Sequence, residues 1–394
     1  MTDHLRLLAE HVVTPTGVLD DAVIDIEGPR LVSIHPRPTG PGPGPCPGPG
    51  PGPERVSGWV VPGFVDTHVH GGGGFDYATT DPRAAVQGRS FHASHGTTTS
   101  FASLVSAPVE VLCGQLSMLA DLVADGHFAG IHLEGPFLSP RKRGAHDPAA
   151  LRNPDAESVQ RLLVAGRGAL SMVTVAPELP GALPAIRQLL DAGVVVAIGH
   201  TDADAETVQR AVDAGASTAT HLFNAMGAIH HRDPGPVPVL TGDPRVHVEL
   251  IADGFHLHPG ILRLASAAAG PRRTVLVTDA MVAAGMPDGA FSLGGLRVSV
   301  RGAMARLVDD EGKVGSIAGS TLTMDRAFAV MTEIVGDIPT VAAMSATNAA
   351  QHFGLADVGR IEPGALANLC VVDERGVLQR VLQAGLWRTD VARQ

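Results

Sequence analysis

The sequence of 394 residues contains little cysteine and few large aromatic residues, with 3 Cys, 2 Trp and 1 Tyr. Cys46, Cys113 and Cys370 lie far apart and form no CxxC pair. This spacing argues against a disulfide framework and against a thiolate zinc site. We therefore expect a protein of a reducing compartment, the cytoplasm.

The sequence also lacks long hydrophobic runs and an excess of positive charge. No apolar run reaches the roughly 18 residues of a membrane span, and residues 1–10 do not resemble a signal peptide. The net charge of -11 argues against a nucleic-acid partner, although a local basic pocket for an anionic metabolite is compatible with it. With 44% hydrophobic residues the chain can bury a large core. We expect neither a membrane nor a nucleic acid as partner.

Proline and glycine are abundant mainly in one segment. Residues 36–53 read PRPTGPGPGPCPGPGPGP, which cannot continue a strand ladder and has almost nothing to bury. We interpret this tract as an exposed loop without a chemical role. Histidine is also abundant, and its 18 residues are spread along the chain and do not form a tag.

Short β-like segments occur at both ends of the chain. LRLLAEHVV, DAVIDIEG and RLVSIHP precede the Pro/Gly tract, and ANLCVVDERGVLQRVLQAGLWR closes the chain. We expect residues 1–60 and 360–394 to form one small β-sandwich domain.

Between these ends the chain alternates apolar runs with helix-compatible stretches. Nearly continuous apolar runs are typical of strands that are buried on both faces. The eight runs are WVVPGFVDTHVH, TTTSFASLVS, FAGIHLEGPF, LSMVTVAPE, VVVAIGHT, STATHLFNAM, VHVELIADGFH and TVLVTDA. Residues 61–359 therefore predict a (β/α)8 TIM-like barrel, with a hairpin at residues 291–308.

Ionisable residues stand repeatedly at the ends of these runs, where barrel enzymes hold their reacting groups. A single histidine at the end of a strand is usually structural. Ionisable residues at the ends of several strands in the same register favour an active site. The residues are His68, His70, Glu134, His200, His221, His256 and Asp279.

These side chains suit a catalytic metal site. His68 and His70 are two residues apart on a strand and point to the same side, so they can share one cation. Glu134 can bind one metal or bridge two, although it can also be a salt-bridged rim residue. His200 and His221 supply neutral nitrogen ligands and leave one position for water.

Asp279 is suited to general acid/base catalysis. A carboxylate opposite the metal-activated water can take its proton and deliver it to a leaving nitrogen. The alternative is a turn residue without a chemical role.

Two loops are candidates for substrate contact. SPRKRGAHDP carries His146 among basic residues, which are often simply solvated. HLFNAMGAIHHRDPGP offers Asn224, Ala225 and Arg232, whose amides and guanidinium can hold a phosphate.

Together these motifs resemble the amidohydrolase superfamily and, within it, the N-acetylglucosamine-6-phosphate deacetylases. The resemblance covers nearly the whole chain. It rests on PGFVDTHVHGG, HLEGPFLSPRKRGAHDP, THLFNAM, ADGFHLHP, LVTDA, AGSTLTM and IEPGALANLCVVD.

The resemblance implies roles for individual residues. The main metal would be held by Glu134, His200 and His221, with Asp279 as acid/base. His146, beside Ala145, would contact the acyl oxygen or the sugar. The 6-phosphate and sugar would be bound by His256, Arg232, Asn224 and Ala225, with Ile317, Ala318 and Gly319 lining the pocket. Arg232 would reach the neighbouring active site of a homodimer. No role is assigned to His230 and His231.

The resemblance also implies a divalent metal, with zinc first and iron, manganese, cobalt or cadmium as alternatives. Family members differ at the first strand, and those with the histidine pair can hold two ions. His68 and His70 are present here, so we expect one or two ions per chain, with a second site bridged by Glu134.

The implied reaction is metal-dependent deacetylation of N-acetylglucosamine 6-phosphate to glucosamine 6-phosphate and acetate. A different C–N hydrolase of the superfamily, acting on a cyclic amide or an N-acyl amino acid or sugar, is one alternative. Most cyclic-amide hydrolases carry a lysine on the fourth strand, and LSMVTVAPE has none. A non-catalytic scaffold is the other alternative, but it would have lost ligands that this sequence keeps.

Overall fold

The computed structural model describes residues 4–37 and 52–391. Most of the Pro/Gly tract, residues 38–51, lies outside the described residues. The chain divides into two compact units, one from residues 1–65, 93–99 and 324–394 and the other from 66–92 and 100–323. Domain boundaries at 60 and 360 stay a prediction. None of the helices in the described ranges combines the length and apolar composition that crossing a membrane requires.

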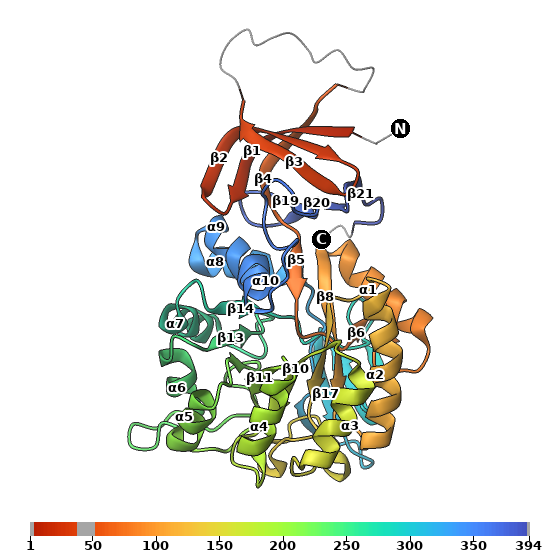
Figure 1. Cartoon of the computed structure of the whole chain (residues 1–394), viewed down its shortest axis with the longest axis vertical. Coiled ribbons are helices and arrows are strands. Elements are labelled where there is room, and N and C mark those ends of the chain that lie inside the picture. Colours follow the sequence, from red (N-terminus) through yellow and green to blue (C-terminus); the bar gives the residue numbers. More distant parts are fainter. Residues whose placement is uncertain (1–3, 38–51, 392–394) are drawn as a thin grey trace. The chain divides into compact units, whose positions relative to one another are not determined.

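The strands and helices of the described chain are labelled in Figure 1. The strands are β1 His4–Thr14, β2 Gly17–Glu27, β3 Arg30–Pro36, β4 Glu54–Pro62, β5 Phe64–Asp66, β6 Gly71–Gly72, β7 Phe75–Asp76, β8 Thr97–Val105, β9 Gly130–Glu134, β10 Leu170–Val175, β11 Val195–Ile198, β12 Thr218–Ala219, β13 His247–Leu250, β14 Thr274–Leu276, β15 Gly289–Leu293, β16 Leu296–Arg301, β17 Met304–Val308, β18 Val314–Ile317, β19 Leu369–Val372, β20 Leu378–Gln383 and β21 Leu386–Trp387. The helices are α1 Pro82–Ser94, α2 Val109–Ala124, α3 Ala156–Gly166, α4 Ala182–Asp191, α5 Ala205–Asp213, α6 Pro236–Gly242, α7 Pro259–Ala269, α8 Met324–Val335, α9 Ile338–Ala342 and α10 Asn348–His352, with short turns η1 Pro140–Lys142, η2 Pro148–Ala150 and η3 Ala343–Thr347.

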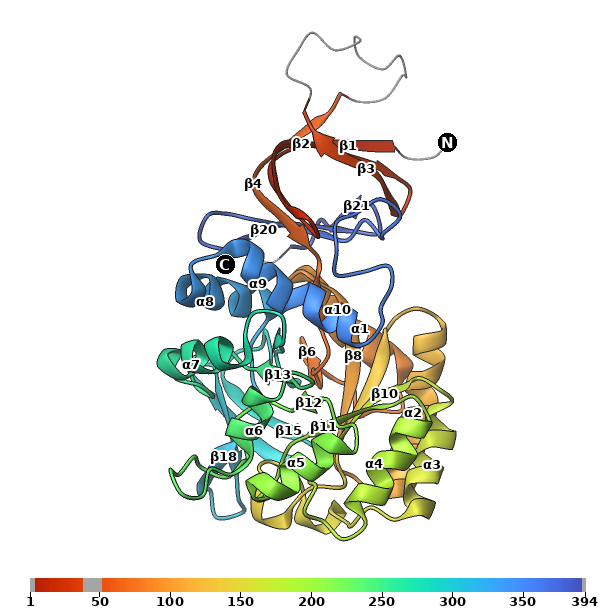
Figure 2. The same ribbon diagram turned by 60° about the vertical axis from the view of Figure 1, so that its left-hand side comes forward.

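The first unit contains a seven-stranded sheet in the order β21-β20-β19-β4-β1-β2-β3. Strand β4 pairs with β1 in parallel and with β19 antiparallel, so both ends of the chain share one sheet, as the sequence predicts. The sheet curls (Figure 2) around one apolar core that includes Leu7, Ile24, Val60, Leu369 and Leu382. The two layers of the predicted sandwich are therefore parts of one continuous sheet.

Most of the second unit is built on an eight-stranded sheet in the order β14-β13-β12-β11-β10-β9-β8-β5, of which most of β5 and the start of β8 fall in the first unit. Every pair from β8 to β14 is parallel. The backbone beyond the edge strands joins them, because His70 N–H donates to the Ala280 carbonyl at 2.7 Å and Asp279 N–H to the His68 carbonyl at 2.8 Å. The predicted TIM-like barrel is confirmed, and each of the eight runs contains one of its strands.

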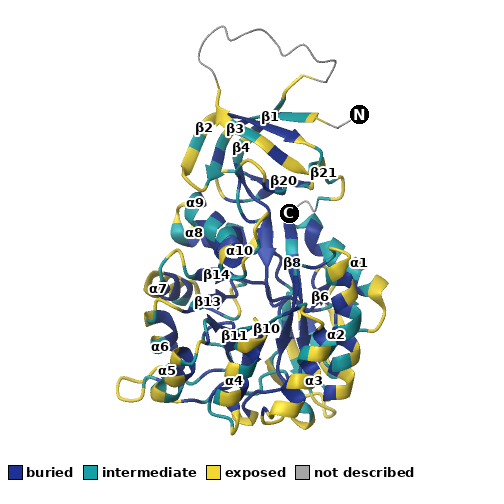
Figure 3. Cartoon of the chain, viewed as in Figure 1, coloured by how far each residue is buried: buried dark blue, intermediate teal, exposed yellow. Residues whose placement is uncertain are grey.

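Helices cover the outside of this sheet, which explains the continuous apolar runs (Figure 3). Helix α5 is typical, because it buries Val208, Ala211 and Val212 at the spacing of one helical face. Asp204 caps its first turn by accepting the Thr207 N–H at 2.8 Å.

Strands β15 to β18 form a separate four-stranded antiparallel sheet. The predicted hairpin at residues 291–308 lies within it. Leu293, Val298 and Val300 pack from this sheet against Val105 and Met281 of the barrel unit. This packing holds the sheet beside the barrel mouth, where the site lies.

Candidate active site

The site residues lie at or just beyond the carboxyl ends of the barrel strands. Glu134 is the last residue of β9, and His200 and His221 each follow their strand by two residues. His200, His221 and Asp279 have positive φ angles of 47°, 26° and 49°. These angles are unusual for residues with a Cβ and are concentrated at functional sites, where the surrounding structure holds them.

Glu134 Oε1 and two histidines form a cluster that we name site A. The Oε1 atom lies 2.8 Å from His221 Nε2 and 3.1 Å from His200 Nε2, and the two Nε2 atoms are 3.1 Å apart. A tetrahedral ion with bonds of about 2.0–2.1 Å separates its ligand atoms by about 3.3 Å. Two imidazoles, one carboxylate and a side open to a cavity therefore fit a catalytic divalent metal.

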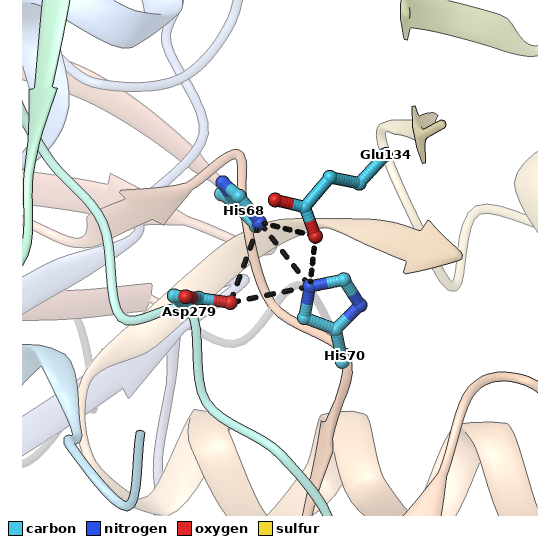
Figure 4. Close-up of side chains that lie close together, drawn as sticks. All are labelled: His68, His70, Glu134 and Asp279. Atoms are coloured by element: carbon cyan, nitrogen blue, oxygen red, sulfur yellow. Dashed lines mark hydrogen bonds and ion pairs between the residues drawn. The ribbon is translucent and has the colours of Figure 1, made fainter. Parts of the chain in front are cut away.

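The other oxygen of Glu134 belongs to a second cluster, which we name site B (Figure 4). Its four side chains are His68, His70, Glu134 and Asp279, all buried. The Nε2 atoms of His68 and His70 lie 3.2 Å apart, and Oε2 lies 3.5 Å and 3.2 Å from them. Asp279 Oδ1 completes the cluster, and Glu134 spans both sites as a bridging carboxylate would.

Second hydrogen bonds fix which ring nitrogen faces each site. His200 Nδ1 lies 2.8 Å from the Lys142 carbonyl, which can only accept, so the proton is on Nδ1. His68 Nδ1 donates to Glu249 Oε2 at 3.1 Å in the same way. In both rings Nε2 therefore faces the site, where an ion that takes the place of a proton would be bound by its lone pair.

The electrostatics of the two sites follow from the burial of opposite charges. Burial lowers the pKa of His68, but the Glu134 and Asp279 carboxylates outweigh it and raise this pKa well above its usual value. Burial would raise the pKa of Glu134, but the charge of His68 and hydrogen bonds from neighbouring histidines hold it well below its usual range. The carboxylates are therefore ionised and attract a positive charge, whether protons or a metal ion.

His146 faces the same cavity with a defined proton. Its Nδ1 accepts the backbone N–H of Ser106 at 3.2 Å and lies 2.9 Å from the Ser106 hydroxyl. Burial lowers the pKa of His146 to about 4, so the ring is neutral at pH 7 and its proton is on Nε2. This Nε2 lies 3.5 Å from Glu134 Oε2, beside site B, and can donate to a substrate oxygen.

A cavity of about 280 Å³ opens above both sites. It brings together most of the residues predicted for metal, substrate and catalysis. Its lining comprises His70, Val105, Glu134, Arg141, Lys142, Gly144, Ala145, His146, His200, His221, Asn224, Ala225, His256, Asp279, Leu293, Ser316, Ile317 and Gly319.

Two predicted substrate residues do not line this cavity. The Ala318 side chain is fully buried against the β15–β18 sheet, because neighbouring side chains of extended chain point to opposite sides. Arg232 is exposed on the loop before α6, where its Nη1 lies 2.7 Å from His231 Nε2. A substrate contact of Ala318 would have to use its backbone, and Arg232 lies outside the cavity lining of this chain.

Two side chains of the cavity lining, His256 and Lys142, are candidates for binding an anion. The Nδ1 atom of His256 lies 2.7 Å from Asp253 Oδ2. Asp253 Oδ1 accepts the backbone N–H groups of Phe255 and His256, which fixes the carboxylate. Lys142 also lines the cavity, and its Nζ lies 3.4 Å from Asp202.

Sequence reasoning missed several residues that hold the site together. Glu249 and His132 are buried in barrel strands, and Ser106 follows β8. His132 lies between Ser103 Oγ and Thr174 Oγ1 at 3.1 and 2.9 Å, and its ring packs edge-on against His68. A polar residue inside an otherwise apolar run, as in HVEL and GIHLE, is the sequence signal that could have identified Glu249 and His132.

The chain is similar to known proteins over most of its length. The amidohydrolase family model matches residues 59–388. The N-acetylgalactosamine-6-phosphate deacetylase of Escherichia coli O157:H7 is 34% identical over 387 residues, which cover 97% of this chain and 98% of the relative. Human N-acetylglucosamine-6-phosphate deacetylase is 37% identical over 353 residues, 85% of each chain.

Solved structures are also similar. A mutant N-acetyl-D-glucosamine-6-phosphate deacetylase from Mycobacterium smegmatis, in complex with N-acetyl-D-glucosamine-6-phosphate, has a TM-score of 0.90 and 40% identity. The match covers 98% of this chain and 99% of that one. The enzyme of Thermotoga maritima has a TM-score of 0.84 and 28% identity, covering 99% and 100% of the two chains.

Proposed function

Because the chain belongs to the amidohydrolase family, we propose that it deacetylates N-acetylglucosamine 6-phosphate to glucosamine 6-phosphate and acetate. The observation that carries this proposal is the bridging position of Glu134 between sites A and B, in the lining of the cavity. The relatives with this substrate in their names match the chain over most of its length.

The side chains of sites A and B would hold one or two divalent ions, for which we propose zinc. Such an ion would act as a Lewis acid toward the acetyl carbonyl and would lower the pKa of water. Asp279 is ionised and lies at the cavity, so it can accept a proton from the attacking water and pass it to the leaving nitrogen.

His146 and the anion-binding side chains would orient the substrate. The Nε2–H of His146 donates to the acetyl oxygen, where negative charge develops as water adds. His256 and the Asn224 and Ala225 amides bind the 6-phosphate at the other end. We propose a homodimer in which the guanidinium of Arg232, which lies outside the cavity of its own chain, completes the neighbour's phosphate site. The thiols of Cys113 and Cys370, both free, support a cytoplasmic location.

A second candidate substrate is N-acetylgalactosamine 6-phosphate, because a relative named for it matches 97% of this chain. The two sugars differ only at one hydroxyl group. The acetyl and phosphate groups bind alike, so the same catalytic residues serve both.

The test is acetate release from four sugars, the two epimers with and without the 6-phosphate. We expect a kcat/KM about a hundredfold higher for the phosphorylated forms, since charged hydrogen bonds contribute roughly 1.5–3 kcal/mol each. Equal rates with and without phosphate would contradict the phosphate assignment. The ratio between the phosphorylated epimers decides between the two candidates.

A further inference from the structure

Glu249 is a carboxylate buried in the middle of the barrel without an assigned role. It lies in β13, and its side chain is 1% exposed. Oε2 accepts from His68 Nδ1 at 3.1 Å and from the backbone N–H of His221 at 3.3 Å. Oε1 has no hydrogen-bond partner among the described side chains.

The strand explains how this carboxylate comes to face the site. Its neighbours Val248 and Leu250 are also fully buried, and successive side chains of a strand point to opposite faces. Glu249 therefore faces the barrel interior, where His68 lies. Burying a carboxylate costs several kcal/mol unless it is paired, so the contact with His68 is the arrangement that compensates this cost.

The contact joins the two metal sites. His68 is a ligand of site B, and His221 is a ligand of site A. The Oε2 atom of Glu249 thus contacts both the ring of His68 and the backbone N–H of His221. His132 restrains the His68 ring from another side, with ring centroids 4.5 Å apart.

We propose that Glu249 is a positioning residue that holds the proton of His68 on Nδ1 and aims Nε2 into site B. The proposal rests on the metal centre described above but not on the identity of the sugar. Hydrogen bonds to the second nitrogen of a histidine ligand orient the ring and raise its basicity as a ligand. Glu249 therefore controls occupancy of site B, whereas at site A it contacts only the backbone N–H of His221 and no ligand side chain.

The test is metal binding by Glu249→Gln, which keeps the size of the side chain and removes its charge. Metal-free protein is titrated with Zn²⁺ in a calorimeter, and Co²⁺ absorption spectra report the coordination. His68→Asn identifies the binding phase of site B. We expect affinity at site B to fall about 10–100-fold, the usual effect of losing such a partner, with site A changed less than threefold.

Asp325→Asn is the matched control. Asp325 is a fully buried carboxylate that accepts from His95 Nδ1 at 3.0 Å, and it belongs to the other compact unit. The control should bind both ions like the unaltered chain. If Glu249→Gln does not fold, Glu249→Asp replaces it, and the shorter carboxylate should also weaken site B selectively.

Combining the changes separates positioning from general damage. In the His68→Asn background, Glu249→Gln should cause no further loss of metal, because its effect passes through His68. Unchanged affinity at site B, or equal loss at both sites, would overturn the proposal. Binding of only one ion by the unaltered chain would also overturn it, while leaving the assignment of the sugar to the acetate assay.

Discussion

Asp279 Oδ1 lies 3.2 Å from His70 Nε2. The Asp279 carboxylate is therefore a possible metal ligand at site B, and it also lines the cavity. Burial would raise the pKa of Asp279, but the positive charge of His68 and the hydrogen bond from His70 lower it to about 2. The carboxylate is therefore ionised at neutral pH and able to accept a proton.

We expect Asp279→Asn to lower kcat about a thousandfold, since an amide cannot accept the proton and general base catalysis contributes roughly 10²–10⁴. Site A shares no side chain with Asp279, so it should still bind its ion. Acetate release and elemental analysis measure the two properties. Turnover near that of the unaltered chain would refute the acid/base role.

Removing metal should lower both activity and stability. Without an ion, Glu134, His68 and His70 at site B face one another across 3.2–3.5 Å with no cation between them. An ion present at a thousand times its Kd stabilises the folded chain by about 4 kcal/mol, which corresponds to about 5 °C in Tm for a chain of this size. Thermal melts with and without chelator measure the shift. An identical Tm would show that the native state binds no ion tightly.

Asp253 is expected to tune phosphate binding through His256. The Asp253 carboxylate holds the His256 ring through Nδ1 at 2.7 Å, and a neutral Asn amide would hold it more weakly. Asp253→Asn should raise KM about tenfold for the phosphorylated sugar and leave kcat nearly unchanged, because a charged hydrogen bond is about 1 kcal/mol stronger than a neutral one. Asp20→Asn is the control, since Asp20 contacts His11 at the same distance of 2.7 Å on the terminal sheet. A rise in KM for both variants would point to a nonspecific effect.

Arg232 gives a test of the homodimer. If its guanidinium reaches the neighbouring site, Arg232→Ala and Asp279→Asn should complement each other. A mixed dimer then has one intact site, formed by Asp279 of one chain and Arg232 of the other. Random assembly of equal amounts should restore about a quarter of full activity at low substrate concentration. Activity equal to the mean of the two separate variants would place Arg232 outside the neighbouring site.

The barrel could be predicted because strands that are buried on both faces produce long apolar runs. Their carboxyl ends meet at one mouth, so the order along the chain also indicated that His200, His221 and Asp279 come together. Glu249 and His132 were missed because they lie within their strands and not at the carboxyl ends, where the site was expected. Ala318 was assigned to the pocket with its neighbours, because the sequence does not show which side chains of VGSIAGS face the cavity.

Gly135 is expected to be required for the position of Glu134. Its φ is +99°, and an added Cβ would lie 2.1 Å from Ser106 Oγ. Ser106 also contacts His146 Nδ1, so Gly135→Ala should displace both Glu134 and His146. We expect a loss of about 2–4 kcal/mol in stability and weaker binding of metal at both sites.

Gly126→Ala separates backbone strain from crowding. Gly126 has a φ of +79° and no atom within 4 Å of the added Cβ, so the change should cost only the roughly 1–2 kcal/mol of a left-handed alanine. Denaturant unfolding and metal titration compare the two variants. Equal stability and unchanged metal binding in both would show that Ser106 gives way without moving Glu134. A selective effect of Gly135→Ala would show that the turn after β9 sets the bridging position of the carboxylate.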